Sequence, residues 1–226
     1  MLQPPIAELP ERTVSGLHAS LIPVIEARVP RTAKILDCGA GTGAWVERLG
    51  RSGYRRCWTI DADETYAGKA PFIVADLNSP FSSLVQSSFG IGKYDLISAI
   101  ETIEHLENPS QFLRECGALL EPGGLLIITS PNLSSPPARL KFLTHSALRS
   151  FDDHGDPTHI TPIFPELFCR IATRAGFRTE VILPAPNASR FLGSRPMAAL
   201  LAKIVCYFFR PNYAGDNSVF LLRLGA

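Results

Sequence analysis

The sequence lacks the features that mark several large protein classes. Its five cysteines are odd in number, scattered and never spaced as Cys-x-x-Cys, which argues against a disulfide framework and a cysteine zinc site. No apolar run reaches the about 18 to 20 residues that a membrane-spanning helix needs. The first residues, with Pro4, Pro5 and Glu8, lack the basic and apolar regions of a signal peptide. These absences predict a soluble protein of a reducing compartment, and we expect it to be cytoplasmic.

An excess of charge of one sign is missing as well. The formal net charge of the 226 residues is +1, so composition gives no electrostatic argument for a nucleic-acid partner. Hydrophobic residues make up 46% and charged residues 19%, a balance typical of a chain that folds around a core. This length fits one domain most simply, and we expect a single domain over residues 1–226.

The most informative stretch is residues 35–44, where an apolar run ends in Asp37 and a helical pattern follows. Gly39, Gly41 and Gly43 lie between them, and glycine is needed where backbone must turn tightly and lie against a ligand. Asp37, at the end of the strand, can pair with a cationic group on that ligand. The stretch also fits the Gly-x-Gly-x-x-Gly/Ala pattern of dinucleotide-binding folds, so by itself it does not exclude a dinucleotide-binding fold.

Two further apolar segments, 57–61 and 72–77, predict strands that end at or near an acid. Asp61 is expected to bind ribose, because a carboxylate can accept hydrogen bonds from both hydroxyls of a diol. The alternative is that Asp61 opens a following helix, which Asp63 and Glu64 nearby would support.

Strands and helices are expected to alternate along the chain. The expected strands are 33–38, 57–61, 72–77, 94–100, 125–130, 177–183 and 218–224. The expected helices are 13–29, 43–51, a short one at 81–86, 109–120 and 165–175. This alternation predicts an α/β fold with a parallel sheet flanked by helices.

Four motifs over residues 33–132 resemble those of class I S-adenosylmethionine-dependent methyltransferases. They are the glycine loop with Asp37, the acid Asp61, the pair Asp76 and Leu77, and Leu-Leu-Glu-Pro-Gly-Gly at 119–124. The resemblance implies a Rossmann-like, seven-stranded, mostly parallel sheet with helices on both faces and an antiparallel seventh strand. It implies that Asp76 contacts the adenine amine, and that the neighbouring backbone amide contacts the ring. A dinucleotide enzyme has no matching requirement for an acid here.

The expected cofactor is S-adenosylmethionine. Its expected binding residues are Asp37, Gly39, Ala40, Gly41, Gly43, Asp61, Ala62, Asp76, Leu77 and Glu101. Residues 12–130 would form the cofactor-binding half of the domain, and 131–163 and 184–217 would be insertions on the substrate side.

Glu101, Glu104 and His105 follow the strand expected at 94–100. If a helix starts here, their spacing brings all three side chains to one face, at the edge of the sheet where ligands bind in α/β folds. Two carboxylates and an imidazole can bind a divalent ion, and such an ion can lower the pKa of an acceptor hydroxyl. Alternatively, His105 acts as a base, or the acids only favour a helix start.

The same Glu-x-x-Glu-His sequence resembles ubiquinone-biosynthesis O-methyltransferases and small-RNA 2′-O-methyltransferases. In the latter a further histidine completes a magnesium site, and His159 is the matching position here, with His154 as runner-up. The resemblance thus implies Mg²⁺ or Mn²⁺ at Glu101, Glu104, His105 and His159. Many small-molecule methyltransferases carry similar residues without a metal, so a site without an ion stays open.

We expect methyl transfer to oxygen on a small molecule, lipid or glycan precursor. The alternatives are a non-catalytic nucleoside-binding module of the same fold and an NAD(P)-dependent oxidoreductase. Residues 131–163 are expected to form a mobile cover over the acceptor pocket. The apolar stretch 197–209 is too short to span a bilayer. It is expected to pack as a buried helix, and the alternative is a helix at a membrane surface.

Overall fold

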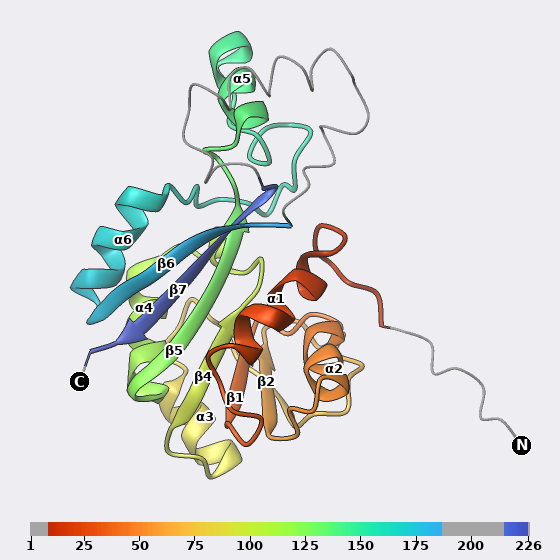
Figure 1. The fold of residues 1–226 in the computed structure, drawn as a ribbon, viewed down its shortest axis with the longest axis vertical. Coiled ribbons are helices and arrows are strands. Elements are labelled where there is room, and N and C mark those ends of the chain that lie inside the picture. Colours follow the sequence, from red (N-terminus) through yellow and green to blue (C-terminus); the bar gives the residue numbers. More distant parts are fainter. Residues whose placement is uncertain (1–8, 187–214, 226) are drawn as a thin grey trace, which may run out of the picture.

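Seven strands form one sheet in the order β3-β2-β1-β4-β5-β7-β6 (Figure 1). The computed structural model describes residues 9–186 and 215–225. The strands are β1 (Ile35–Cys38), β2 (Cys57–Asp61), β3 (Phe72–Val74), β4 (Tyr94–Ala99), β5 (Leu120–Pro131), β6 (Phe177–Ala185) and β7 (Asn217–Leu224). Pairings from β3 to β5 are all parallel, whereas β7 runs antiparallel to both β5 and β6. The predicted mostly parallel sheet with an antiparallel seventh strand is confirmed.

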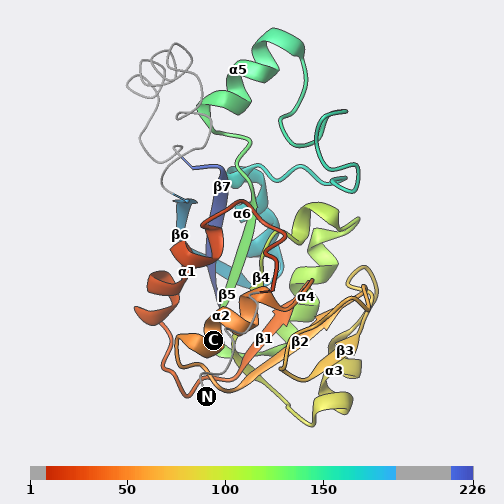
Figure 2. The same ribbon diagram turned by 90° about the vertical axis from the view of Figure 1, so that its right-hand side faces the viewer.

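Helices cover both faces of this sheet (Figures 1 and 2). The α-helices of the described residues are α1 (Leu17–Glu26), α2 (Ala44–Arg51), α3 (Ser82–Phe89), α4 (Pro109–Leu119), α5 (Pro136–His145) and α6 (Pro165–Arg174). Side chains of α1 and α2 pack on one face, and side chains of α3, α4 and α6 pack on the other. Successive residues of a strand point to opposite faces, so the central strands are apolar at nearly every position and fully buried.

The start of α4 shows how the local sequence determines where a helix begins. The side chain of Asn108 accepts a hydrogen bond from the backbone N–H of Gln111, and Pro109 occupies the first helical position. From there, Phe112 and Cys116 lie one turn apart on the buried side. The strand expected at 72–77 is shorter than predicted, because β3 ends at Val74 and a turn closed by the Ser79 N–H bond to the Asp76 carbonyl follows.

The helix α5 is a feature that the sequence pattern did not predict. Its first turn is capped by Ser135, whose hydroxyl accepts from the N–H of Ala138. In both views it lies beyond the end of β5, away from the sheet (Figures 1 and 2). Leu143 is 80% exposed, so α5 has no apolar stripe facing a core, and the periodicity that reveals a helix is weak.

Within the described residues, no helix combines the length and the apolar character that crossing a bilayer requires. The stretch 197–209, expected to be a buried helix or a surface helix, lies outside the described residues.

Candidate active site

A cavity of about 530 Å³ lies at the carboxyl ends of β1, β2 and β4. All the predicted cofactor-binding residues except Gly43 line it, namely Asp37, Gly39, Ala40, Gly41, Asp61, Ala62, Asp76, Leu77 and Glu101. Gly43 instead precedes α2 with φ 91°, and a Cβ there would lie 2.8 Å from the ring of Tyr66. Gly43 therefore shapes the turn from which the helix starts.

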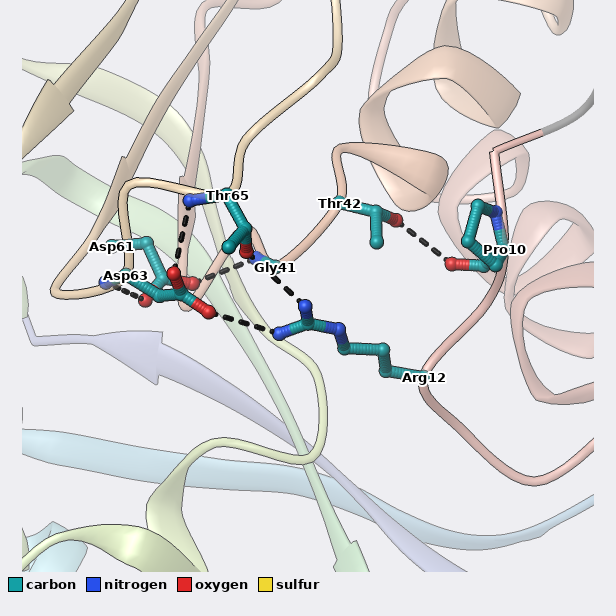
Figure 3. A network of polar contacts seen from close by, with 7 residues as sticks. All are labelled: Pro10, Arg12, Gly41, Thr42, Asp61, Asp63 and Thr65. Atoms are coloured by element: carbon teal, nitrogen blue, oxygen red, sulfur yellow. Dashed lines mark hydrogen bonds and ion pairs between the residues drawn. The ribbon is translucent and has the colours of Figure 1, made fainter.

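Asp61 joins the end of β2 to the glycine loop. Its Oδ2 accepts from the backbone N–H of Gly41 at 2.7 Å, and its Oδ1 accepts from the N–H of Asp63 at 2.9 Å (Figure 3). Gly39 approaches the loop after β4 so closely that a Cβ would lie 2.3 Å from the Thr102 hydroxyl. The glycines therefore let backbone and carboxylate pack together around the cavity.

Asp76 and Asp37 occupy opposite environments. Asp76 is exposed, and hydrogen bonds from the Ser79 hydroxyl and the Asn78 N–H lower its pKa, so it is a carboxylate at neutral pH. Asp37 is buried at the end of β1, and burial raises its pKa to about 7, although a hydrogen bond from the Ser98 hydroxyl opposes that shift.

The segment before α1, which we call the N-terminal arm (residues 9–16), contributes Arg12 and Thr13 to the lining of this cavity. Figure 3 shows Pro10 and Arg12 of the arm beside the glycine loop and the loop after β2. The guanidinium of Arg12 donates to Asp63 and to the Thr65 hydroxyl, each at 3.1 Å. Further along, the Thr42 hydroxyl donates to the backbone carbonyl of Pro10 at 2.8 Å. The sequence reasoning missed Arg12, because its partners lie more than fifty positions away and nothing local marks it.

A second cavity of about 250 Å³ adjoins the first. Five residues line both cavities: Arg12, Thr13, Glu101, His105 and Asp156. Most of the remaining lining of the second cavity is polar or charged: Arg149, Ser150, His159, Asp216 and Asn217, beside Val14 and Pro131. A ligand in the second cavity would therefore meet a ligand in the first at Glu101 and His105.

The segment after β4 is a tight turn, so the condition considered for Glu101, Glu104 and His105, an α-helix starting at Glu101, is not met. Glu101 has φ 52°, and its N–H donates to the Thr129 hydroxyl, which in turn donates to the Glu101 carboxylate. A single 3-10 turn follows at Ile103–His105, and the α-helix begins only at Pro109. The helical spacing of Glu101, Glu104 and His105 therefore does not explain how they lie.

Among the described residues, Glu104, His105 and His159 form a group in which one potential ligand atom of each lies within 4.8 Å of the others. Backbone pairing brings them together, because the N–H groups of Ile160 and Thr161 both donate to the carbonyl of Glu104 at 2.9 Å. The two imidazole rings meet edge to face, with centroids 4.7 Å apart.

Two of the predicted residues lie outside this group. Glu101 lines both cavities, and its carboxylate accepts from Thr129. His154, the alternative to His159, has a side chain that is 89% exposed, next to Asp152. Of the predicted four ligands, three are therefore close together, and Glu101 is their neighbour.

Hydrogen bonds indicate which ring nitrogens of the two histidines are free. Nδ1 of His159 lies 2.8 Å from the carbonyl of Ser150, and Nδ1 of His105 lies 3.2 Å from the carbonyl of Thr158. A carbonyl only accepts, so Nδ1 of each ring donates in these contacts, and in the neutral form of His105 the lone pair is then on Nε2. Burial and the neighbouring His159 lower the pKa of His105, which favours this neutral form.

Glu104 is an unusual buried acid. It is 0% exposed, and within the described residues neither of its carboxylate oxygens has a hydrogen-bond partner. Burial, together with the charge of Glu101, raises its pKa well above the usual range. Burial likewise raises the pKa of Glu101 to about 7. An unpartnered buried carboxyl is costly, so a polar or cationic partner at Glu104 would stabilise the site.

A family model described as a methyltransferase domain matches residues 11–181. The chain belongs to the methyltransferase domain family. The matched region contains the glycine loop, the three strand-end acids and the Glu104–His105–His159 group. An oxidoreductase or a non-catalytic nucleoside-binding module is not favoured for this family member.

Curated relatives of this methyltransferase-family chain include two ubiquinone biosynthesis O-methyltransferases. The one from Caulobacter sp. (strain K31) is 32% identical over 104 residues, which cover 44% of this chain and 41% of the relative. The one from Xanthomonas axonopodis pv. citri (strain 306) is 29% identical over 140 residues, which cover 56% of this chain and 55% of the relative. The chain thus spans about half the length of the curated relatives it matches.

Solved structures share the methyltransferase fold. A SAM-dependent methyltransferase from Archaeoglobus fulgidus aligns with a TM-score of 0.62 and 18% identity, covering 91% of this chain and 94% of that one. At this identity the likeness concerns the fold alone.

Proposed function

We propose that this chain binds S-adenosylmethionine in the cavity of about 530 Å³ and methylates an oxygen of an acceptor held in the adjoining cavity of about 250 Å³. The observation that carries this proposal is the meeting of the two cavities at Glu101 and His105. The printed name of the relatives, ubiquinone biosynthesis O-methyltransferase, supports oxygen as the acceptor atom.

Each strand-end acid has a separate role in holding the cofactor. Asp61 accepts from the ribose hydroxyls, and its bonds to the Gly41 and Asp63 amides hold it in place. Asp76 accepts from the adenine amine, and the N–H of Leu77 contacts the ring. Asp37 pairs with the ammonium of the amino-acid part. The cofactor supplies a methyl group on a sulfonium, and in-line transfer gains most of its rate from alignment and exclusion of water.

A divalent ion fits the residues beside the acceptor. Glu104 offers two unpartnered oxygens, and His105 and His159 each offer one ring nitrogen within the same 4.8 Å group. The carbonyls that fix their Nδ1–H groups are the outer partners typical of metal-bound histidines. Oxygen and nitrogen donors without thiolate admit Mg²⁺ or Mn²⁺, and such an ion would lower the pKa of an acceptor hydroxyl.

His105 has an alternative role if no ion binds. His105 lines both cavities, so its imidazole can take the proton of the acceptor hydroxyl as a general base. The two accounts differ in their response to a chelator.

The reacting end of the acceptor is polar in this proposal. Arg149, Asp156 and Asp216 line the second cavity, and charged walls suit hydroxyl groups better than a hydrocarbon chain. The acceptor class is a hydroxylated small molecule, or the hydroxylated head of a lipid or glycan precursor. Residues 131–163 supply part of this wall and act as a cover over it.

The test is methyl transfer from labelled S-adenosylmethionine to a panel of catechols, hydroxylated quinone precursors and sugars. We expect a labelled product with the methyl group on oxygen, formed together with one equivalent of S-adenosylhomocysteine. Binding of the demethylated cofactor without transfer to any member or to a host extract would favour a non-catalytic module instead.

A further inference from the structure

Three buried side chains at the cofactor cavity form a chain of hydrogen bonds, and two of them, Asp37 and Trp45, line the cavity. The indole Nε1–H of Trp45 donates to the Ser98 hydroxyl oxygen at 3.0 Å, and the Ser98 hydroxyl donates to Oδ1 of Asp37 at 2.7 Å. Exposed fractions are 2% for Trp45, 0% for Ser98 and 1% for Asp37. Water therefore does not reach Ser98, and these bonds hold its position.

The sheet register places these residues together. Asp37 on β1 is the direct partner of Ser98 on β4 in the parallel pairing, so both side chains point to the same face. That face is covered by α1 and α2, and Trp45 belongs to the first turn of α2, directly after the glycine loop. The loop that cradles the cofactor thereby also positions the donor to Ser98.

The chemistry of the three groups fixes the direction of the bonds. An indole N–H only donates, so the Ser98 oxygen must be the acceptor on that side. Its single proton is then directed at Asp37, and a donor aimed at a carboxyl favours the charged carboxylate. Around it the face is apolar, with Ile35 and Leu96 beside the pair, and such surroundings alone would favour the neutral acid.

We infer that Ser98, held by Trp45, is a positioning residue that keeps the Asp37 carboxylate charged and directed at the ammonium of the bound cofactor. This inference rests on the proposed function, because it assigns the cationic amino-acid part of S-adenosylmethionine to Asp37. Ser98 itself touches the acid and not the cofactor, since it does not line the cavity.

Other titratable groups near Asp37 do not replace this role. Asp61 adds a negative charge that disfavours the carboxylate. Burial raises the pKa of the thiols of Cys38 and Cys57 and of the Tyr66 phenol, so all three are neutral at pH 7. On the α1 side, the His18 ring lies tilted against Trp45, with centroids 5.3 Å apart and its Nδ1 3.4 Å from Glu11, and burial lowers the pKa of that histidine.

The test compares two ligands by calorimetry on the full chain. S-adenosylhomocysteine carries the ammonium, whereas 5′-methylthioadenosine has the same nucleoside without the amino-acid part. We expect Ser98→Ala to weaken binding of the first at pH 7 by about 10-fold or more, the scale of a lost hydrogen bond to a charged group. Binding of methylthioadenosine should stay within about 2-fold, because Asp61 and Asp76 are untouched.

The pH dependence provides a second readout. Burial raises the pKa of Asp37 to about 7, so affinity of the wild type for S-adenosylhomocysteine should rise with pH through that range and fall below it. Without the Ser98 donor the midpoint should move to higher pH. Ser98→Thr, which keeps the hydroxyl, should restore the wild-type profile, and Trp45→Phe should shift it partly.

The positioning role would be overturned if Ser98→Ala weakened the binding of both ligands equally. It would also be overturned if the variant kept the wild-type affinity and pH midpoint for S-adenosylhomocysteine. If the wild type binds neither nucleoside, the proposed function itself is refuted, and this outcome is distinct from the other two. Thermal melts of the Ala, Thr and Phe variants show which of them are folded. The inference therefore remains testable through Trp45→Phe if Ser98→Ala does not fold.

Discussion

Excess chelator is expected to abolish methyl transfer by this chain while leaving the affinity for S-adenosylhomocysteine unchanged. The reason is that the candidate ligands Glu104, His105 and His159 lie together, that the two histidines line the proposed acceptor cavity, and that the glycine loop needs no ion. Addition of Mg²⁺ or Mn²⁺ should restore turnover. Rate and calorimetric affinity, measured on the same chelated sample, separate the two effects.

A matched pair of histidine variants sharpens this prediction. His159→Ala should lower metal affinity and rate together by at least about 100-fold. Mutating a residue that only hydrogen-bonds a metal ligand already lowers metal affinity or activity by about 10- to 100-fold, and His159 is a proposed ligand itself. His154→Ala, in the same loop but 89% exposed and outside the group, should behave as the wild type. Full activity in excess chelator, with no metal in the purified protein, would instead support His105 as a base.

Asp61→Ala is the second change with a large expected effect. It removes the carboxylate that we propose accepts hydrogen bonds from the ribose hydroxyls. It also removes the acceptor of the 2.7 Å hydrogen bond from the backbone N–H of Gly41. We expect a loss of about 1.5–3 kcal/mol in cofactor binding, the range for hydrogen bonds to a charged group, or roughly 10- to 150-fold in affinity. Titration of S-adenosylhomocysteine into the variant measures it.

The control for Asp61→Ala is Asp63→Ala. Asp63 lies on the same loop and contacts Arg12; its side chain is 44% exposed at the cavity lining and has no proposed contact with ribose, so its removal should change cofactor affinity by less than about 3-fold. If Asp61→Ala binds as tightly as this control, Asp61 is not the ribose ligand and its role is confined to the loop.

The sheet could be predicted from sequence because its central strands are buried on both faces. Such strands must be apolar at nearly every position, so residues 94–100 and 125–130 stand out from their surroundings. The carboxyl ends of parallel strands meet at one edge, so Asp37, Asp61 and Asp76 could be assigned to one cavity before any contact was known.

What could not be predicted depends on pairing between distant segments. The turn at Glu101 is fixed by Thr129 on the neighbouring strand, so local spacing could not show whether a helix starts there. Ser98 looked like one polar residue in an apolar strand, and its role needs the β1–β4 register and the indole of Trp45. Arg12 reaches the cavity through an arm that has no periodic pattern.

Calorimetry of the purified chain with three ligands tests the central claim most directly. S-adenosylmethionine and S-adenosylhomocysteine are expected to bind at micromolar strength in the cavity lined by the glycine loop, Asp61 and Asp76, whereas a nicotinamide dinucleotide should give no heat. Heat with the dinucleotide, and none with either sulfur nucleoside, would contradict the account.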